Sequence, residues 1–276
     1  DPPAMPHTAS DRTDLDFRSY GAGPPLVILH GLFGSAEGWH PVARALSQRF
    51  AVYVPDLRNH GNSLRSERMD YAALAEDARA FIAGLGLGRA CLLGHSLGGK
   101  TAMQLASLFP ALVEKLVVVD IAPRGYPPLY AEAIEALARL DLQAIASLRE
   151  AEARLAPSIP EPALRRVLLK SLKHAGGGAY RWKVNLGAIR RNYPLLCAPL
   201  QLHPWNGPCL FIRGGRSDYI RDSDWAPTRA VFPRARLATL PGSGHWVHAD
   251  APADFVRTVE GFLLEPAAAP GECCRG

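Results

Sequence analysis

The sequence predicts an α/β protein built on a mostly parallel sheet that helices cover on both faces. Short apolar runs alternate along the chain with segments of helical length, and the runs are almost continuously hydrophobic. A strand that is apolar on both faces must be buried on both, which is typical of a parallel sheet between two helical layers. The composition agrees, because 48% of the 276 residues are hydrophobic, enough for a substantial core.

Six apolar runs account for the predicted parallel strands. They occupy residues 26–30, 51–55, 90–94, 116–120, 209–213 and 237–240. An earlier run, 15–20, alternates between apolar and polar residues and is expected to form an antiparallel edge strand. Between the runs lie five segments of helical length, at 36–49, 71–84, 98–109, 223–232 and 252–264.

Residues 122–206 break this alternation. They contain no convincing strand, and helical patterns recur at 129–140, 142–155, 162–172 and 181–191. We therefore expect a helical cap inserted into a core of residues 15–121 and 207–265, at a place suited to covering a site. Residues 1–14 are expected to be a disordered lead, or one left from expression, and 266–276 a flexible tail.

The basic excess of the chain belongs to this interval. The whole chain has 31 Lys and Arg against 26 Asp and Glu, a net charge of +5 that is too small to indicate nucleic-acid binding. Residues 122–206 hold 12 basic and 6 acidic side chains, a net of +6. Two interpretations stay open: a solvated Arg-rich surface, or a cap that attracts anionic substrates.

The cysteine spacing and the hydropathy predict in which cellular compartment the protein resides. The five cysteines (Cys91, Cys197, Cys209, Cys273 and Cys274) have no regular spacing, which argues against a disulfide framework and against a zinc site. No uncharged apolar run reaches the roughly 18–20 residues that span a bilayer, and residues 1–10 lack a secretory signal pattern. A cytoplasmic protein without a membrane span is expected.

The sharpest motif is G-x-S-x-G at residues 94–98, preceded by an apolar run and followed by a helical one. A serine on such a strand-to-helix turn is held in strained geometry, so its neighbours must be small, and Gly94 and Gly98 supply that room. The turn exposes the Ser96 hydroxyl at a helix N-terminus, which favours developing negative charge. We predict Ser96 as the nucleophile.

Here the chain resembles the α/β-hydrolase superfamily, over residues 26–264. Further motifs follow in order: HGLFG at 30–34, DLRNHGNS at 56–63 in place of the commoner D-x-R-G-x-G-x-S, GHSLGGKTAM at 94–103 and GHWVHAD at 244–250. The RNHG and GHSLGGK forms are similar to a branch of small carboxylesterases active on short acyl chains. The resemblance implies an eight-stranded sheet with a helical cap, and no cofactor.

The general base is expected late in the chain, since the superfamily order is serine, acid, histidine. His245 follows the last predicted strand and is the predicted base, with His248 as its competitor. His30 and His95 are interpreted as residues that support turns, and His60 as a hydrogen-bonding residue of the RNHG turn.

The acid has two candidates. Asp218 follows the fifth parallel strand, at the ordinary superfamily location, and is the preferred prediction. Asp120 ends the fourth strand and is the alternative, because some members of the resembled branch use an acid at that earlier place. Either carboxylate could fix the histidine tautomer and stabilise the imidazolium.

A tetrahedral oxyanion needs preorganised donors, each typically worth about 3–4 kcal/mol. The backbone N–H of Leu97 is predicted as one donor, and that of Leu32 or Phe33 as the second. Trp39, Trp246, Trp182 and Tyr126 are predicted to line the substrate pocket. Trp39 and Trp246 lie nearer the motifs and are the better candidates, whereas packing of the cap against the core explains Trp182 and Tyr126 equally well.

The sequence thus predicts a serine carboxylester hydrolase of short-to-medium acyl esters that works through an acyl-enzyme. Thioester, polyester or C–C bond hydrolysis and cofactor-free perhydrolysis remain alternatives on the same fold. The expected partner is a small-molecule or polymeric ester, with no nucleic acid, no metal and no cofactor, and the expected state is a monomer or homodimer.

Overall fold

A sheet of seven strands forms the centre of the molecule. The computed structural model describes residues 15–176 and 179–266, and its main sheet has the order β1-β3-β2-β4-β5-β8-β9. The strands are β1 (Phe17–Tyr20), β2 (Pro25–Leu29), β3 (Ala51–Pro55), β4 (Ala90–His95), β5 (Val113–Val119), β8 (Cys209–Gly214) and β9 (Ala235–Leu240). β1 pairs antiparallel with β3, and every other neighbouring pair is parallel. The predicted fold class is confirmed.

The strand count differs from the expectation of eight. Within the described residues the main sheet has seven strands, the same number as the apolar and alternating runs in the sequence. The eighth strand was implied only by the family resemblance, and the described chain has a single antiparallel edge strand, β1, before the parallel strands begin.

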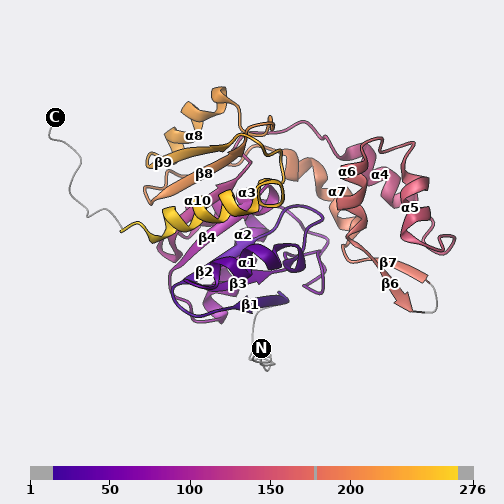
Figure 1. Cartoon of the computed structure of the whole chain (residues 1–276), viewed down its shortest axis with the longest axis horizontal. Helices are drawn as coiled ribbons and strands as arrows, with labels where there is room; N and C mark the ends of the chain where they lie inside the picture. Colours follow the sequence, from indigo (N-terminus) through magenta and orange to yellow (C-terminus); the bar gives the residue numbers. More distant parts are fainter. Residues whose placement is uncertain (1–14, 177–178, 267–276) are drawn as a thin grey trace.

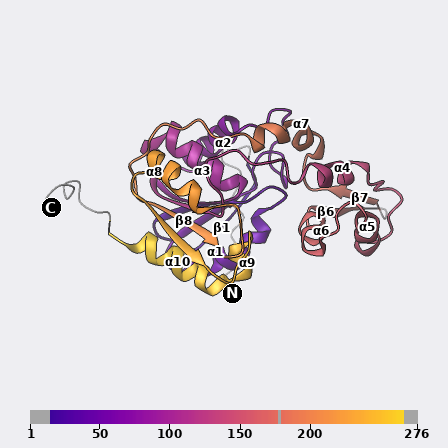
Figure 2. The ribbon, with the colours of Figure 1, turned by 90° about the horizontal axis from the view of Figure 1, so that it is seen from above.

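Helices cover both faces of the sheet, as Figures 1 and 2 show. One apolar cluster joins one face to α1 (His40–Leu46), α9 (Val247–Asp250) and α10 (Pro252–Leu264). A second cluster joins the other face to α2 (Tyr71–Gly84), α3 (Leu97–Leu108) and α8 (Trp225–Val231). Short 3-10 turns stand at η1 (Ala36–Trp39), η2 (Pro110–Leu112) and η3 (Asp222–Asp224). The strands bury both faces, which explains their continuous hydrophobicity.

The segment between β5 and β8, here called the insertion (residues 122–206), lies at one side of the sheet in both views (Figures 1 and 2). Its elements are α4 (Ala131–Arg139), α5 (Leu148–Leu155), α6 (Pro162–Leu169), β6 (Leu172–Gly176), β7 (Ala179–Trp182) and α7 (Leu186–Cys197). The expectation that it holds no strand is wrong, because β6 and β7 pair antiparallel. Leu172 and Tyr180 are buried on one side of this pair, an alternation too short to stand out in the sequence.

Several predictions fall on residues that the structure does not describe. These are the lead at 1–14, Cys273 and Cys274, and the tail from 267 onward. Among the described residues, no helix combines the length and the apolar character needed to cross a bilayer.

Candidate active site

Ser96 stands on the turn between β4 and α3 in a strained backbone conformation. Its φ is 52° and its ψ is −114°, and its N–H donates to the Val119 carbonyl at 3.1 Å. A Cβ at Gly94 would lie 2.2 Å from the Gly98 oxygen, and one at Gly98 would lie 2.1 Å from the Leu29 oxygen. Both glycines are therefore required by packing, and the crowded turn directs the serine outward.

His245 is held by the buried carboxylate of Asp120, which follows β5. Its Nδ1 donates to Asp120 Oδ2 at 2.8 Å, and Asp120 is 0% exposed. The same carboxylate accepts from the Gly214 N–H at 2.9 Å and from the Ser217 hydroxyl. Because Nδ1 carries the shared hydrogen, the His245 Nε2 lone pair is left for a proton.

Asp218, the preferred acid of the sequence analysis, is not at the imidazole. Its side chain is exposed, and within the described residues its carboxylate forms no hydrogen bond or ion pair. The turn closed by the Ser217 N–H and the Gly214 carbonyl, 3.1 Å apart, brings Ser217 inward instead. Tyr219 stacks on the His245 ring at 3.8 Å. The structure thus brings Asp120, the alternative acid, to the histidine.

The loop after β2 offers one free amide rather than two. The Gly34 N–H donates to the Gly31 carbonyl at 2.9 Å, and φ of Phe33 is 62°, the pattern of a type II turn. The Phe33 N–H donates to His60 Nε2 at 3.2 Å and is therefore occupied. Leu32 remains as the candidate donor from this loop. The Leu97 N–H lies in the first turn of α3, where amides lack acceptors within the helix.

Two buried histidines hold these loops in place. His60 donates through Nδ1 to the Arg58 carbonyl at 2.9 Å, and burial lowers its pKa to about 3, so it is neutral and can accept from Phe33. His30 donates through Nδ1 to Gly31 at 2.8 Å and accepts the Leu57 N–H through Nε2 at 2.9 Å. The expectation that these residues support turns is confirmed.

Two further histidines, His95 and His248, lie near the site. His95 donates through Nε2 to the His245 carbonyl at 2.9 Å, and burial holds its pKa well below the usual value. His248 stacks on Trp39 at 4.1 Å, and burial lowers its pKa to about 3. A desolvated, stacked imidazole of this kind is a poor proton acceptor near neutral pH, which leaves His245 as the candidate base.

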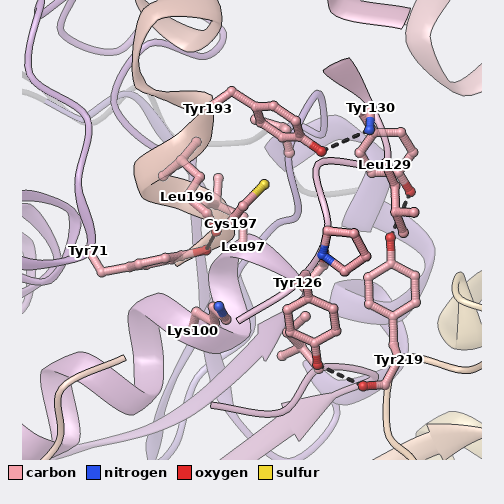
Figure 3. A pocket seen from close by; sticks show the side chains of 14 residues that line it. Tyr71, Leu97, Lys100, Tyr126, Leu129, Tyr130, Tyr193, Leu196, Cys197 and Tyr219 are labelled. Atoms are coloured by element: carbon pink, nitrogen blue, oxygen red, sulfur yellow. Dashed lines mark hydrogen bonds between the residues drawn. The ribbon is translucent and has the colours of Figure 1, made fainter. Parts of the chain in front are cut away.

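Ser96 lies where two hollows meet. The first, called the tyrosine hollow, has a volume of about 480 Å³ and appears in Figure 3. Side chains from both the core and the insertion line it, namely Tyr71, Lys100, Tyr126, Tyr130, Tyr193 and Tyr219. The second, called the histidine hollow, has a volume of about 350 Å³ and contains His245 and Trp246. Leu32 and Tyr130 also line both hollows, so a substrate carbonyl at Ser96 has room on either side.

Of the four aromatic residues predicted to line the pocket, two line a hollow and two do not. Tyr126 lines the tyrosine hollow and Trp246 the histidine hollow. Trp39 is 3% exposed and packs behind the site, while Trp182 pairs with Leu172 in the β6–β7 hairpin, so neither lines a hollow. Lys100 and Tyr219 also line the tyrosine hollow, although neither was predicted from the sequence to do so. The position of Lys100, one helical turn after Ser96, was the available signal.

No metal site accompanies these residues. Across 15–176 and 179–266, the structure contains no group of three or more His, Cys, Asp or Glu side chains placed to hold a metal ion.

Comparison with known proteins gives a consistent family. The model of the alpha/beta hydrolase family matches residues 26–258. The sn-1-specific diacylglycerol lipase ABHD11 of Mus musculus is 39% identical over 249 residues, 87% of this chain and 81% of the relative. Esterase YbfF of Escherichia coli is 34% identical over 244 residues, 87% of this chain and 92% of the relative. A solved marine microorganism esterase superposes with a TM-score of 0.87 at 39% identity, covering 90% of this chain and 98% of its own. The chain belongs to the alpha/beta hydrolase family.

Proposed function

We propose that the chain is a serine carboxylester hydrolase in which Ser96 is the nucleophile, His245 the base and Asp120 the acid. One observation carries the proposal: Ser96 and His245 line the same hollow, and Nδ1 of the imidazole donates to the buried carboxylate of Asp120. The relatives named esterase and diacylglycerol lipase support the same activity. The chain is thus an enzyme that hydrolyses carboxylic esters.

In the acylation half-reaction, His245 Nε2 takes the proton of the Ser96 hydroxyl while the oxygen attacks the ester carbonyl. The carbonyl oxygen becomes an oxyanion, and the amides of Leu97 and Leu32 are placed to donate to it. Asp120 keeps the imidazole in the Nδ1–H tautomer and stabilises the imidazolium. His245 then gives the proton to the leaving alkoxide, and the acyl group stays on Ser96.

Deacylation reverses these roles with water as the nucleophile. His245 removes a proton from water, which attacks the acyl-Ser96 carbonyl, and the second tetrahedral intermediate uses the same amides. Its collapse breaks the bond to Ser96 Oγ, releases the carboxylic acid and returns the proton to the serine. The ester is cleaved without a cofactor in this scheme.

The substrates are esters with short-to-medium acyl chains. The two hollows are small, and both open at Ser96, so the acyl chain and the alcohol part each have limited room. Tyrosines and aliphatic side chains form most of the walls of the tyrosine hollow, which suits a modest apolar chain.

The test is a series of p-nitrophenyl esters from acetate to palmitate, assayed with the wild type and with Ser96→Ala. The wild type should show an optimum below the longest chains, and Ser96→Ala should lose turnover by at least about a thousandfold. A phosphonate ester should label Ser96 in the wild type alone. Full activity in Ser96→Ala would refute the proposal.

A further inference from the structure

Lys100 is a buried cation that the proposed mechanism does not use. It lies on α3 one turn after Ser96, is 1% exposed, and lines the tyrosine hollow (Figure 3). Its Nζ donates to the Ala198 carbonyl at 2.8 Å and lies 5.3 Å and 5.0 Å from the ring centroids of Tyr71 and Tyr126. One of the three N–H donors of the ammonium therefore has a hydrogen-bond acceptor. The two tyrosine rings contribute cation–π contacts through their faces and do not accept a conventional hydrogen bond.

No carboxylate neutralises this ammonium. Within the described part of the chain, neither Asp nor Glu forms an ion pair with Lys100. The nearby cation Arg124 is paired with Asp224 at 3.0 Å. The direct contacts of the Lys100 ammonium are a backbone carbonyl and two tyrosine rings, and none of these carries a negative charge. Burial lowers the pKa of Lys100 to about 8, so the side chain still carries its charge near pH 7. A buried charge without a counter-ion is costly, unless a ligand supplies the opposite charge.

The proton transfer assigns the two parts of the ester to the two hollows. The leaving alkoxide must receive its proton from His245, which lines the histidine hollow. The alcohol part therefore occupies the histidine hollow, and the acyl chain extends from Ser96 into the tyrosine hollow, where Lys100 lies. Ser96 and Lys100 line the same hollow and lie one helical turn apart in the sequence, so we expect an acyl chain of only a few carbons to reach from one to the other.

We propose that Lys100 is a specificity residue that binds a carboxylate at the far end of the acyl chain, so that half-esters of short dicarboxylic acids are preferred substrates. The proposal rests on the proposed ester hydrolysis. The bond formed is a charge-assisted N–H···O contact inside a desolvated hollow, where such contacts discriminate strongly between a carboxylate and a methyl group.

The experiment compares three esters with equal acyl or ester length. Monoethyl glutarate carries the carboxylate on the acyl side, ethyl pentanoate is its neutral counterpart, and the pentanoate ester of 3-hydroxypropanoate carries the carboxylate on the alcohol side. The wild type should show a higher kcat/KM for monoethyl glutarate than for ethyl pentanoate. Lys100→Met should lower that ratio roughly ten- to hundredfold.

Controls separate charge recognition from support of the fold. Lys100→Gln keeps an N–H donor for the Ala198 carbonyl but removes the charge. It should lower the ratio of kcat/KM for monoethyl glutarate to that for ethyl pentanoate as much as Lys100→Met does. Lys170→Met removes an exposed charge at the end of α6 and should keep that ratio. Turnover of ethyl pentanoate reports whether each variant is folded, and glutarate should inhibit the wild type more strongly than pentanoate does, a comparison that needs no variant.

A pH series adds an independent readout. Cys197, Tyr71 and Tyr126 face Lys100 from α7, α2 and the loop after β5, and burial raises the pKa of each of them. Lys100 is therefore the group in this contact set whose pKa, lowered by burial to about 8, falls in the range of the series. The glutarate-to-pentanoate ratio should fall as the pH rises through about 8.

The outcomes are distinct. The proposal is overturned when the ratio is unchanged in both Lys100 variants, when all three esters lose activity equally, or when glutarate and pentanoate inhibit the wild type alike. Equal activity of wild type and Ser96→Ala on all three esters is a different result, which would remove the proposed function itself.

Discussion

The sheet core and the insertion contribute to the site in different ways. The core positions the reacting groups through backbone geometry, as at Gly98, where an added Cβ would lie 2.1 Å from a neighbouring carbonyl oxygen. At Gly187, in α7 of the insertion, the nearest atom to such a Cβ is a terminal nitrogen of Arg191 at 3.3 Å. The geometry is therefore fixed where bonds are made and broken, and is more tolerant where the insertion forms the walls.

The two regions are joined along α7. The Asn185 N–H donates to the Asn59 carbonyl at 2.8 Å, and the Tyr71 hydroxyl donates to the Leu196 carbonyl at 2.9 Å. The Lys100 ammonium reaches Ala198 just beyond the same helix. Both ends of α7 are thus tied to the core, whereas α5 and the β6–β7 hairpin lie farther out (Figure 1).

The largest expected effect tests the acid of the core. Asp120→Asn removes the carboxylate that fixes the Nδ1–H tautomer of His245, so kcat should fall by a factor on the order of 10⁴. Asp218→Asn should stay within about twofold, because its side chain faces solvent. Steady-state kinetics on one ester measure both, and a comparable loss in Asp218→Asn would return the acid role to that residue.

The second effect concerns the nucleophile turn. Gly98→Ala places a methyl group against the Leu29 carbonyl, and neither backbone segment can move without disturbing β2 or α3. We expect the free energy of unfolding to fall by more than about 3 kcal/mol. Urea denaturation followed by circular dichroism measures it, and an unchanged midpoint would show that the turn is less constrained than its contacts indicate.

The third effect is an acid sensitivity of the core. His60 is buried and His248 is partly buried, and desolvation lowers the pKa of each to about 3, while an unfolded histidine titrates near 6.5. The contribution of these histidines to the free energy of unfolding is greatest above about pH 6.5, where they are neutral in both states. It falls as the pH drops toward 3, because the unfolded histidines bind protons that the folded ones do not. Each histidine contributes a slope of up to about 1.4 kcal/mol per pH unit.

His248→Phe checks that slope. Phenylalanine keeps an aromatic ring against Trp39 but binds no proton. The variant should unfold with a shallower dependence on pH between about 6 and 4, by close to one proton. Urea denaturation midpoints measured across that pH range test the prediction. If the midpoints of the wild type and the variant change with pH in parallel, His248 is not a source of the acid sensitivity.

The smallest effect belongs to the insertion. Gly187→Ala lies inside α7, where the added methyl meets only the movable end of Arg191. Alanine is the better helix former, so the free energy of unfolding should rise by about 0.5–1 kcal/mol. Thermal unfolding measures the gain. A loss comparable to that of Gly98→Ala would remove the contrast between the two regions.

Most of the fold could be predicted from the sequence because hydrophobic periodicity is a local signal. All six apolar runs are parallel strands, and the alternating run is the antiparallel edge strand β1. The β6–β7 hairpin could not be predicted, since its inward face depends on packing against the insertion helices. The position of Ser96 was indicated by a motif whose glycines are required by the crowded turn, and that of His245 by its place after the last strand.

The choice between the acids depended on orientation, which sequence spacing does not contain. Asp120 has a φ of 49° at the end of β5, and that local reversal directs its carboxylate to His245. In the loop after β8, the Ser217 side chain points inward and donates to Asp120, whereas the side chain of the next residue, Asp218, is exposed to solvent. The occupied amide of Phe33 is a similar case, since only the folded loop brings His60 to it.

The placement of the acid on β5 has a consequence for the division of the chain. Ser96 and Asp120 follow adjacent, hydrogen-bonded strands of one β4-α3-β5 unit, whereas His245 comes after β9. A cut between β6 and β7 would leave the proposed nucleophile and the proposed acid on one fragment and the proposed base on the other. Neither fragment would hydrolyse esters by itself, so recovered turnover would report the reassembly of the two halves. The architecture thus lends itself to a split reporter of protein association, divided within the region that the core constrains least.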